Sequence, residues 1–206
     1  MNPERQHELV RDATLTFAHM IKTYLPAKLE NKPVEVVFKI PSQADIETAK
    51  KNGAALVSVI HVDTQKSTQV QSTFEPIVRK EDDSGGITEY RQAPPVFITP
   101  RYMITPWCDD PLLDQVMTGL LLQLFYDHTY FAPEDVRGNS IHTEDQPPIS
   151  HDEKFKIDEQ MRFWQASGGT FRPSLVFTVT LRLDSPRLQP IRRVKERVLD
   201  YKKLEG

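Results

Sequence analysis

The chain has 206 residues, which is the length of one domain or of two small ones. Its formal net charge of -3 excludes the strongly basic composition that is typical of dedicated nucleic-acid-binding domains. Its single cysteine, Cys108, excludes an internal disulfide, its apolar runs are too short to span a membrane, and its polar first residues predict no secretory signal peptide.

The start of the chain predicts one helix followed by strands. Apolar residues recur at three- and four-residue steps over residues 3–24, which is typical of an amphipathic helix lying on a sheet, and Asp12 falls among its polar residues. Residues 34–40 and 55–62 have the composition of strands, and residues 41–52 between them form either a loop or a short helix.

The polar stretch 63–94 contains a hairpin signal. The β-prone residues 74–79 and 87–90 flank a turn sequence rich in Asp and Gly over residues 82–86. We therefore expect a hairpin that protrudes from the domain and adds nothing to its core.

A long strand and the clearest helix of the chain come next. The strand covers residues 96–105, and Pro100 removes one backbone donor from it, so we expect a bulge or a sheet edge there. The helix has Asp109 or Asp110 as its N-cap and Pro111 at its first position. Its wide apolar face, which we expect to be buried, comprises Leu112, Leu113, Val116, Met117, Leu120, Leu121, Leu124 and Phe125.

The segment that follows this helix is irregular before it returns to a strand. Residues 131–153 are polar and interrupted by proline, which is typical of a loop with at most one turn of helix. Residues 154–157 predict a short strand, residues 158–166 a short helix capped by Asp158, and residues 171–183 the last strand.

The order of these elements predicts an α+β fold. We expect a single domain over residues 1–186, with a mostly antiparallel sheet and helices packed on one of its faces. Residues 187–206 form a basic tail with apolar residues at helical spacing, which docks either on its own domain or on a neighbour.

Three groups of residues have the composition of chemical sites. His142, Glu144 and His151 carry side chains that bind divalent cations, although their spacing matches no metal motif. A base and its orienting carboxylate could come from His61 and Asp63, and Cys108 precedes a helix N-terminus. A solvated loop, a polar strand end and a buried structural thiol explain the same residues. We therefore expect no catalytic residue, no metal site and no cofactor.

Three segments together resemble a known family. They are the strand over residues 55–62, the stretch from Pro94 to His128, and the strand that begins with Phe171-Arg172-Pro173-Ser174. They are similar to the terminator, or cap, proteins of extracellular contractile injection systems, the phage-tail-like particles of the antifeeding-prophage and virulence-cassette type. The resemblance covers most of the chain.

The resemblance implies a tail-terminator-like fold and a structural function without turnover. Such a protein closes the distal end of the sheath and inner tube, ends their polymerisation and stabilises the particle. The implied partners are the sheath and inner-tube proteins and further copies of the chain in a homohexameric ring, with no nucleic acid and no membrane. Assembly is expected in the cytoplasm, with release of the particle on lysis.

Two alternatives remain open from the sequence. One is a metal-dependent hydrolase that uses the loop over residues 142–153, and the other is a different tail-completion or connector protein.

We expect the hairpin and the tail to make the contacts with neighbouring subunits, because exposed strands and amphipathic segments favour docking. The candidate contact residues are Phe74, Ile77, Arg79, Ile87, Tyr90, Ile191, Arg193, Val194, Arg197, Val198 and Tyr201.

Overall fold

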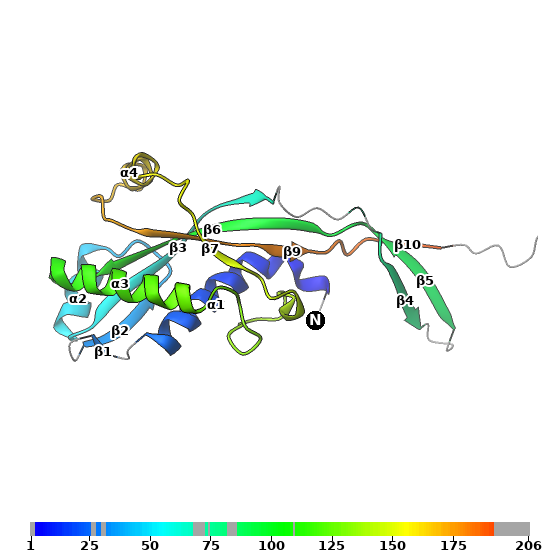
Figure 1. Ribbon diagram of the computed structural model, residues 1–206, viewed down its shortest axis with the longest axis horizontal. Coiled ribbons are helices and arrows are strands. Elements are labelled where there is room, and N and C mark those ends of the chain that lie inside the picture. Colours follow the sequence, from blue (N-terminus) through cyan, green and yellow to red (C-terminus); the bar gives the residue numbers. More distant parts are fainter. Residues whose placement is uncertain are drawn as a thin grey trace, which may run out of the picture. The chain divides into compact units, whose positions relative to one another are not determined.

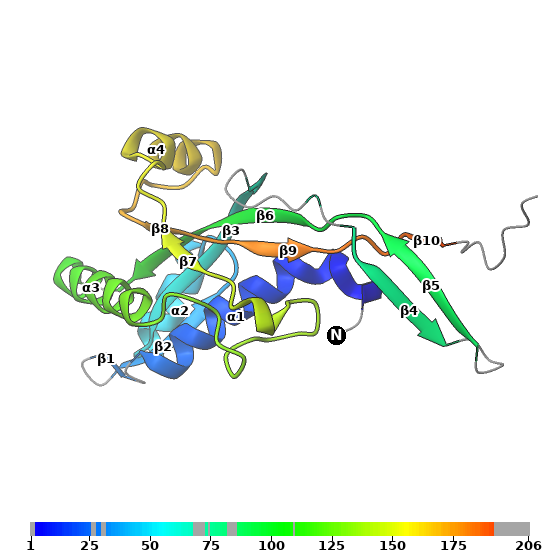
Figure 2. The same ribbon diagram turned by 45° about the vertical axis from the view of Figure 1, so that its right-hand side comes forward.

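The computed structural model of the chain separates into two compact units (Figure 1, Figure 2). The main unit comprises residues 1–72 and 95–184, and the second unit comprises residues 73–94 and 185–206. The structure describes residues 3–25, 28–29, 32–67, 73, 75–81, 86–108 and 110–191. Within these residues the main unit holds a seven-stranded sheet with helices, and the second unit holds a three-stranded sheet.

The main unit alternates helices and strands. Its helical segments are the 3-10 helix η1 (Pro3–Glu8), α1 (Leu9–Tyr24), α2 (Gln43–Lys51), α3 (Pro111–Asp127), the 3-10 turn η2 (Thr143–Asp145) and α4 (Ile157–Ala166). Its strands are β1 (Lys28–Leu29), β2 (Lys32–Val37), β3 (Ala55–Lys66), β6 (Val96–Trp107), β7 (Ile149–His151), β8 (Leu175–Val179) and β9 (Leu181–Leu183).

The main sheet is mostly antiparallel. Its strand order is β1-β2-β3-β6-β8-β7, and β9 pairs with β6 beyond the end of β8. Only β2 and β3 are parallel among the described pairs, because α2 provides the crossover that a parallel connection needs. The predicted α+β class with a mostly antiparallel sheet is therefore confirmed.

The larger core lies between α1, α3 and one face of the sheet. Alternate residues of the two central strands face it, with Val57 and Val59 from β3 and Tyr102 and Ile104 from β6. The two helices contribute Leu9, Ala13, Phe17, Met20, Ile21, Leu113, Met117, Leu121, Leu124 and Phe125. Each large apolar side chain buried in this way stabilises the fold by about 1.5–3 kcal/mol.

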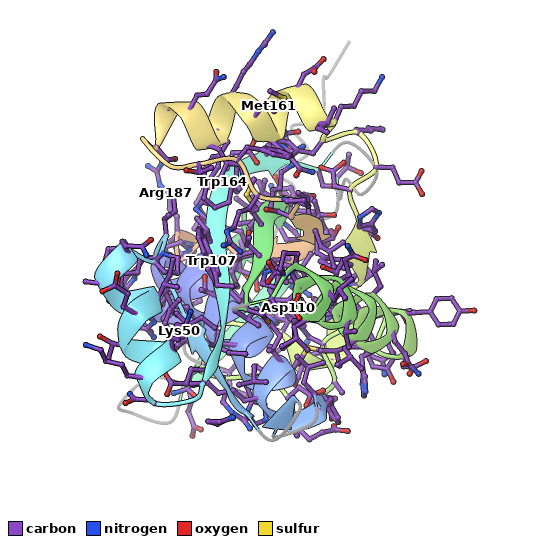
Figure 3. The ribbon with its side chains drawn as sticks, turned by 90° about the vertical axis from the view of Figure 1, so that its left-hand side faces the viewer. Lys50, Trp107, Asp110, Met161, Trp164 and Arg187 are labelled. Atoms are coloured by element: carbon purple, nitrogen blue, oxygen red, sulfur yellow. The ribbon has the colours of Figure 1, made fainter. Side chains whose placement is uncertain are left out.

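A smaller core covers the opposite face of the same strands. Leu56 and Met103 point to this side, where they pack with Trp107, with Ala49 of α2 and with Trp164 of α4. The Trp107 and Trp164 rings meet edge to face with centroids 5.7 Å apart (Figure 3). The prediction that the helices pack on one face of the sheet thus holds for α1 and α3 only. Helices α2 and α4 pack on the opposite face, because the central strands carry apolar residues on both faces.

The ladder is interrupted on both sides of Pro100, inside β6. On β3 the register shifts between His61 and Asp63, which leaves a bulge beside the pair of Pro100 with Thr64. On the other side β8 and β9 are separated at Thr180, whose N–H donates to the carbonyl of Pro148 (3.1 Å). The predicted bulge is confirmed, although it lies in the partner strand, and Pro100 is not at a sheet edge.

The start of α3 follows the prediction, but its burial does not. The Asp110 carboxylate accepts the Leu112 N–H at 2.9 Å and Pro111 occupies the first turn, while Asp109 lies outside the described residues. The helix packs on the core with one side only, so Leu112 and Val116 are exposed instead of buried. Because α3 is apolar on all sides, its periodicity does not identify the buried side.

The region before α4 also differs from the prediction. The predicted strand over residues 154–157 is a turn that leads into α4, and the strand here is β7. α4 begins at Ile157, with the Glu159 carboxylate accepting the Lys156 N–H (3.1 Å), so Asp158 is not its cap.

The second unit is an antiparallel sheet in the order β10-β5-β4. Its strands are β4 (Ile77–Glu81), β5 (Ile87–Gln92) and β10 (Leu188–Pro190). The hairpin of β4 and β5 was predicted, but β3 of the main sheet runs on to Lys66, so the excursion begins later than residue 63. The first residues of the predicted tail form β10, which pairs with β5.

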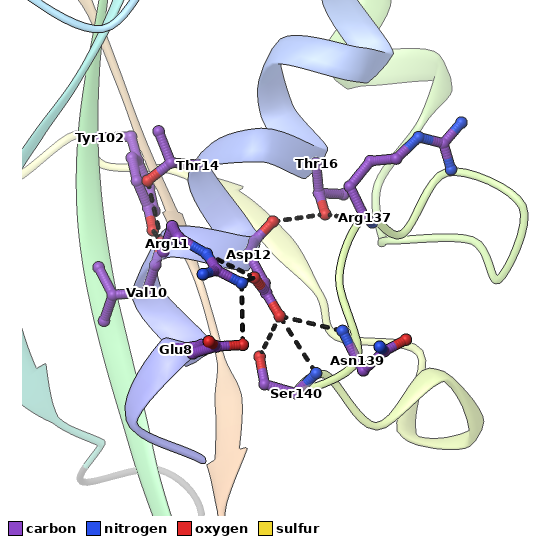
Figure 4. A network of polar contacts seen from close by, with 10 residues as sticks. All are labelled: Glu8, Val10, Arg11, Asp12, Thr14, Thr16, Tyr102, Arg137, Asn139 and Ser140. Carbon is purple, nitrogen blue, oxygen red and sulfur yellow. Dashed lines mark hydrogen bonds and ion pairs between the residues drawn. The ribbon is translucent and has the colours of Figure 1, made fainter. Parts of the chain in front are cut away.

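A buried carboxylate attaches the segment over residues 131–145 to α1 (Figure 4). Asp12 is fully buried, and one of its oxygens accepts the N–H groups of Asn139 and Ser140 (both 3.1 Å) and the Ser140 hydroxyl (2.6 Å). Its other oxygen accepts two N–H groups of Arg11 (3.1 and 2.8 Å). The sequence placed Asp12 on the polar side of the helix and this segment in a loop, whereas the two form one ordered structure.

The backbone that surrounds Asp12 leaves no room for a side chain at residue 138. Gly138 has a φ of 91°, and a Cβ placed on it would lie 2.1 Å from the Asp12 carboxyl carbon. Glycine therefore allows both the left-handed backbone and the close approach of the chain to the carboxylate.

The network also determines the pKa of Asp12. Burial by itself raises the pKa, but hydrogen bonds from Ser140 and Arg11 favour the charged form and together outweigh it, so the pKa is lowered. The Asp12 carboxylate therefore binds a proton more readily in the unfolded chain than in the folded chain. Its charged form stabilises the fold above about pH 4, and this stabilisation is lost as the pH falls through the lower, folded-state pKa.

We expect Gly138→Ala to destabilise the fold by about 3 kcal/mol or more, because it combines a strained φ with the clash against Asp12. The matched control is Gly53→Ala, which has a φ of 65° but nothing within 4 Å of the new Cβ, and which should cost only about 1–2 kcal/mol. Urea unfolding measures both, and equal costs would contradict the close approach.

We expect Asp12→Asn to lower the free energy of unfolding by about 1–3 kcal/mol at neutral pH, because an amide leaves donors of the loop unpaired. The difference from the unmodified chain should shrink as the pH falls from about 4 through the lower, folded-state pKa of Asp12, because the unmodified chain then loses the stability that its charged carboxylate contributes. Denaturant unfolding as a function of pH tests this, with the exposed Asp127→Asn as control. A difference that stays constant with pH would be inconsistent with a charged Asp12.

Candidate functional site

The described residues of the three-stranded sheet form no hydrophobic core of their own. None of its described residues is buried, and none belongs to either core cluster. A small sheet without a buried face is at best marginally stable in water. This exposed sheet is therefore the first candidate for an interface.

One face of this sheet combines exposed isoleucines with paired charges. Ile77 is 56% exposed and Ile87 is 71% exposed, and the register places them on the same face as Arg79. The Arg79 guanidinium pairs across the strands with Glu89 (3.2 Å). Surface ion pairs of this kind contribute only about 0–1 kcal/mol to stability. Burial of Ile77 and Ile87 against a partner would therefore provide the larger gain in free energy.

The opposite face of the sheet mixes apolar side chains with the polar Lys80, Thr88 and Gln92. Tyr90 lies here, opposite Val78 on β4 and Pro190 on β10. The Ile191 N–H donates to the carbonyl of Glu89 (2.9 Å), which continues the pairing of β10 with β5 by one residue. Of the predicted contact residues, Ile77, Arg79 and Ile87 therefore share one face, and Tyr90 is on the other.

β4 is an edge strand of this sheet. Among the described strands it pairs with β5 alone, so one side of its backbone has no strand partner there. Edge strands with free N–H and C=O groups accept further strands, and charged side chains such as Arg79, Lys80 and Glu81 limit unspecific pairing. The edge is therefore suited to a specific added strand.

The other predicted contact residues lie outside the described part of the chain. They are Phe74, Arg193, Val194, Arg197, Val198 and Tyr201.

The residues considered for metal or acid–base chemistry are engaged in other contacts. His142 is buried, with Nε2 2.7 Å from Asp184 and Nδ1 3.3 Å from Glu144, whereas His151 is exposed on β7 and packs on Phe177. A search of the described residues finds no group of three or more His, Cys, Asp or Glu side chains placed to hold a metal ion.

The predicted base and carboxylate on β3 are likewise separated by their partners. His61 contacts the Thr64 hydroxyl (2.8 Å), and the Asp63 carboxylate accepts a hydrogen bond from Arg101 (2.7 Å). Cys108 is buried at the end of β6, where its N–H donates to Asp114 (2.7 Å). Each of these residues therefore has a local hydrogen-bonding partner, and Asp63 is engaged by Arg101 instead of by His61.

The sequence did not indicate a groove of about 920 Å³ in the main unit, formed by the starts of α2 and α3 and by residues 167–173. Arg172 lies over the Trp107 ring at 4.5 Å and pairs with Asp114 (3.0 Å), which fixes the wall of the groove. The Trp107 indole N–H donates to the Ser58 hydroxyl (3.0 Å). The lining of the groove therefore combines apolar surface with paired charges.

Comparisons with known proteins point to one family. The model of the Pvc16 N-terminal domain matches residues 12–196 of the chain. Among curated proteins, none matches this sequence.

None of the described helices has the length and apolar character needed to cross a bilayer.

Two solved structures share the fold. One is the sheath/tube terminator of the extracellular contractile injection system PVC in its extended state, with a TM-score of 0.61 and 20% identity. The other is the tube-terminating cap of the anti-feeding prophage, with a TM-score of 0.60 and 18% identity. Both comparisons cover 95% of this chain, which spans 65% and 61% of the length of those chains.

Proposed function

The chain belongs to the family of the Pvc16 N-terminal domain, and we propose that it acts as a terminator that closes the distal end of the sheath and inner tube of a contractile injection system. The observation that carries this proposal is the common fold over 95% of the chain with two tube terminators. Since both are terminators, they favour this function over another tail-completion or connector protein.

We further propose that the chain acts as a homohexameric ring. A tube built from stacked rings exposes unpaired edges at its growing end, and such edges accept further subunits. Head-to-tail contacts close into a ring when the rotation between neighbours closes. A ring that pairs with the end of the tube but offers no equivalent surface beyond it stops growth.

The contacts with sheath and inner-tube proteins are proposed to involve the second unit. Among its described residues none is buried, Ile77 and Ile87 are exposed, and β4 has one side without a described strand partner. The basic tail, with Arg193, Val194, Arg197, Val198 and Tyr201, is proposed to add to these contacts on the basis of its sequence. Neither nucleic acid nor a membrane is part of this proposal.

The proposed role is structural and involves no turnover. The His142 imidazole between Asp184 and Glu144, and Asp63 beside Arg101, stabilise the fold through these contacts. This argues against the metal-dependent hydrolase. We propose assembly in the producing cell's cytoplasm, followed by release of the particle on lysis.

Deletion of this chain from a particle-producing strain should give sheath–tube assemblies of uncontrolled length, or no stable particles. The physical reason is that nothing then covers the extensible end. Negative-stain electron microscopy measures the length distribution, and a strain complemented with the unmodified chain is the control. Particles of normal length and number without the chain would exclude the proposed function.

The double substitution Ile77→Asp with Ile87→Asp should reduce capping at least about tenfold while the main unit stays folded, because it places charge on the face proposed for contact. The matched control is Ile157→Asp on α4, which changes an isoleucine that is 61% exposed in the main unit. Complementation of the deletion strain gives the capping activity, and the unfolding midpoint reports the fold. If the double variant still limits tube length as well as the unmodified chain does, the second unit is not part of the interface.

A further inference from the structure

One side of α3 is an exposed apolar surface. Its large side chains are 67%, 50%, 44% and 83% exposed, and we call them the outer face of α3: Leu112, Val116, Leu122 and Tyr126. They form two groups, Leu112 with Val116 and Leu122 with Tyr126, whose centres lie about 15 Å apart along the helix. Gly119 lies between the groups, and no described atom is within 4 Å of the position that its Cβ would take. The outer face therefore has two apolar contact points and an open centre.

The outer face carries no charge of its own. The sequence between Asp114 and Asp127 contains no Asp, Glu, Lys or Arg. Depletion of charge and an exposed tyrosine are typical of the centre of an interface. Because nothing on this face could neutralise an unpaired charge, a partner has to bring apolar side chains, or charges that are already paired with one another.

The second unit has a surface with these properties. The strand register places two isoleucines and four charged residues on the same side of its sheet, which we call the isoleucine face: Ile77, Arg79, Glu81, Ile87, Glu89 and Arg91. The central charges are paired, Arg79 with Glu89 at 3.2 Å, and Arg91 is paired with Glu75 at 3.1 Å. The isoleucines are 56% and 71% exposed.

The two surfaces match in the spacing of their apolar side chains. Ile87 lies opposite Glu81, which is four residues along β4 from Ile77, so the two isoleucines are about 13 Å apart along the strands. This is close to the separation of the two apolar groups on α3. Between the isoleucines stands the pair of Arg79 with Glu89, and the open centre of the outer face leaves room for these longer side chains.

The charges at the ends of the two surfaces favour one orientation. Arg91 lies directly opposite Ile77, and Asp127 is exposed at the C-terminal end of α3. If Ile77 packs at that end, a guanidinium approaches a carboxylate, whereas the reverse orientation brings Glu81 toward Asp127. In the favoured orientation Glu81 meets the N-terminal end of α3, where the helix dipole favours negative charge and Asp110 is already engaged as the cap.

We propose that the isoleucine face of one copy packs on the outer face of α3 in the neighbouring copy of the ring, with Ile87 near Leu112 and Ile77 near Tyr126. Each copy then contributes one surface and receives the other, which is a head-to-tail contact that can close into a ring. The proposal rests on the proposed terminator ring and names the partner of the isoleucine face. The edge of β4 and the tail remain available for the sheath and inner-tube proteins.

Cysteine cross-linking in assembled particles tests this contact. We expect Ile87→Cys combined with Leu112→Cys, expressed in the deletion strain and treated with a short bismaleimide, to give a ladder of covalent oligomers on a denaturing gel. The matched control is Ile87→Cys combined with Tyr126→Cys, which should stay monomeric because Tyr126 lies about 21 Å from Leu112 along α3. Since Cys108 is buried, the unmodified chain and the single variants report the background.

The outcomes separate this contact from the terminator function. Particles of normal length that contain the double variant but give no ladder would overturn the contact and leave the function intact. A cross-link within one chain, or a ladder from the Tyr126 pair instead of the Leu112 pair, would also overturn it. Failure of the function itself is seen with the unmodified chain, when its presence or absence does not change particle length.

Reversal of the end charges provides a second measurement that needs no cross-link. Arg91→Glu should reduce capping about fivefold or more, because it places a carboxylate next to Asp127 of the neighbouring copy. Adding Asp127→Arg to the same chain should restore capping, although it cannot repair the lost pair of Arg91 with Glu75. Thermal unfolding shows whether each variant is folded. A double variant that caps no better than Arg91→Glu alone would show that these two residues do not face each other, and would overturn the proposal.

Discussion

The main unit depends on a buried negative charge whose partners are far away in the sequence. Asp12 sits on the buried side of α1, where an unpaired carboxylate would cost several kcal/mol. Two backbone N–H groups and the hydroxyl of the segment around Ser140 satisfy it, together with Arg11. The irregular segment between α3 and β7 is thereby held on α1, and it completes the larger core with Phe131 and Ile141. Gly138 makes this arrangement possible, since any side chain there would displace the carboxylate.

Two surfaces of the described chain expose apolar side chains that a partner could cover. None of the described residues of the three-stranded sheet is buried, and α3 exposes Leu112, Val116, Leu122 and Tyr126. An isolated monomer gains nothing from either feature, whereas an assembly subunit does. A stable folded body with exposed apolar surface agrees with a protein that acts by contact and shape. The family and the fold of two tube terminators agree with the same conclusion.

The sequence predicts those features whose signals are local. The periodicity of α1, the cap and proline of α3, the turn of the β4–β5 hairpin and the α+β class all depend on neighbouring residues. It does not predict the role of Asp12, because the partners at Asn139 and Ser140 have no pattern that identifies them. The apolar character of α3 on all sides conceals which side is buried, and the pairing of β10 with β5 joins segments far apart in the chain. The sequence also located the hairpin that is the candidate interface. It did not show that Ile87 and Tyr90 lie on opposite faces of that hairpin.

The most direct test of the terminator function is to add the purified chain to polymerising sheath and inner-tube proteins and to measure tube length by electron microscopy. If the chain covers the growing end, mean length should fall as the ratio of chain to tube subunits rises, and labelled chain should lie at one end of each tube. A length distribution that does not respond to the chain, or label spread along the tube walls, would contradict a role in ending polymerisation.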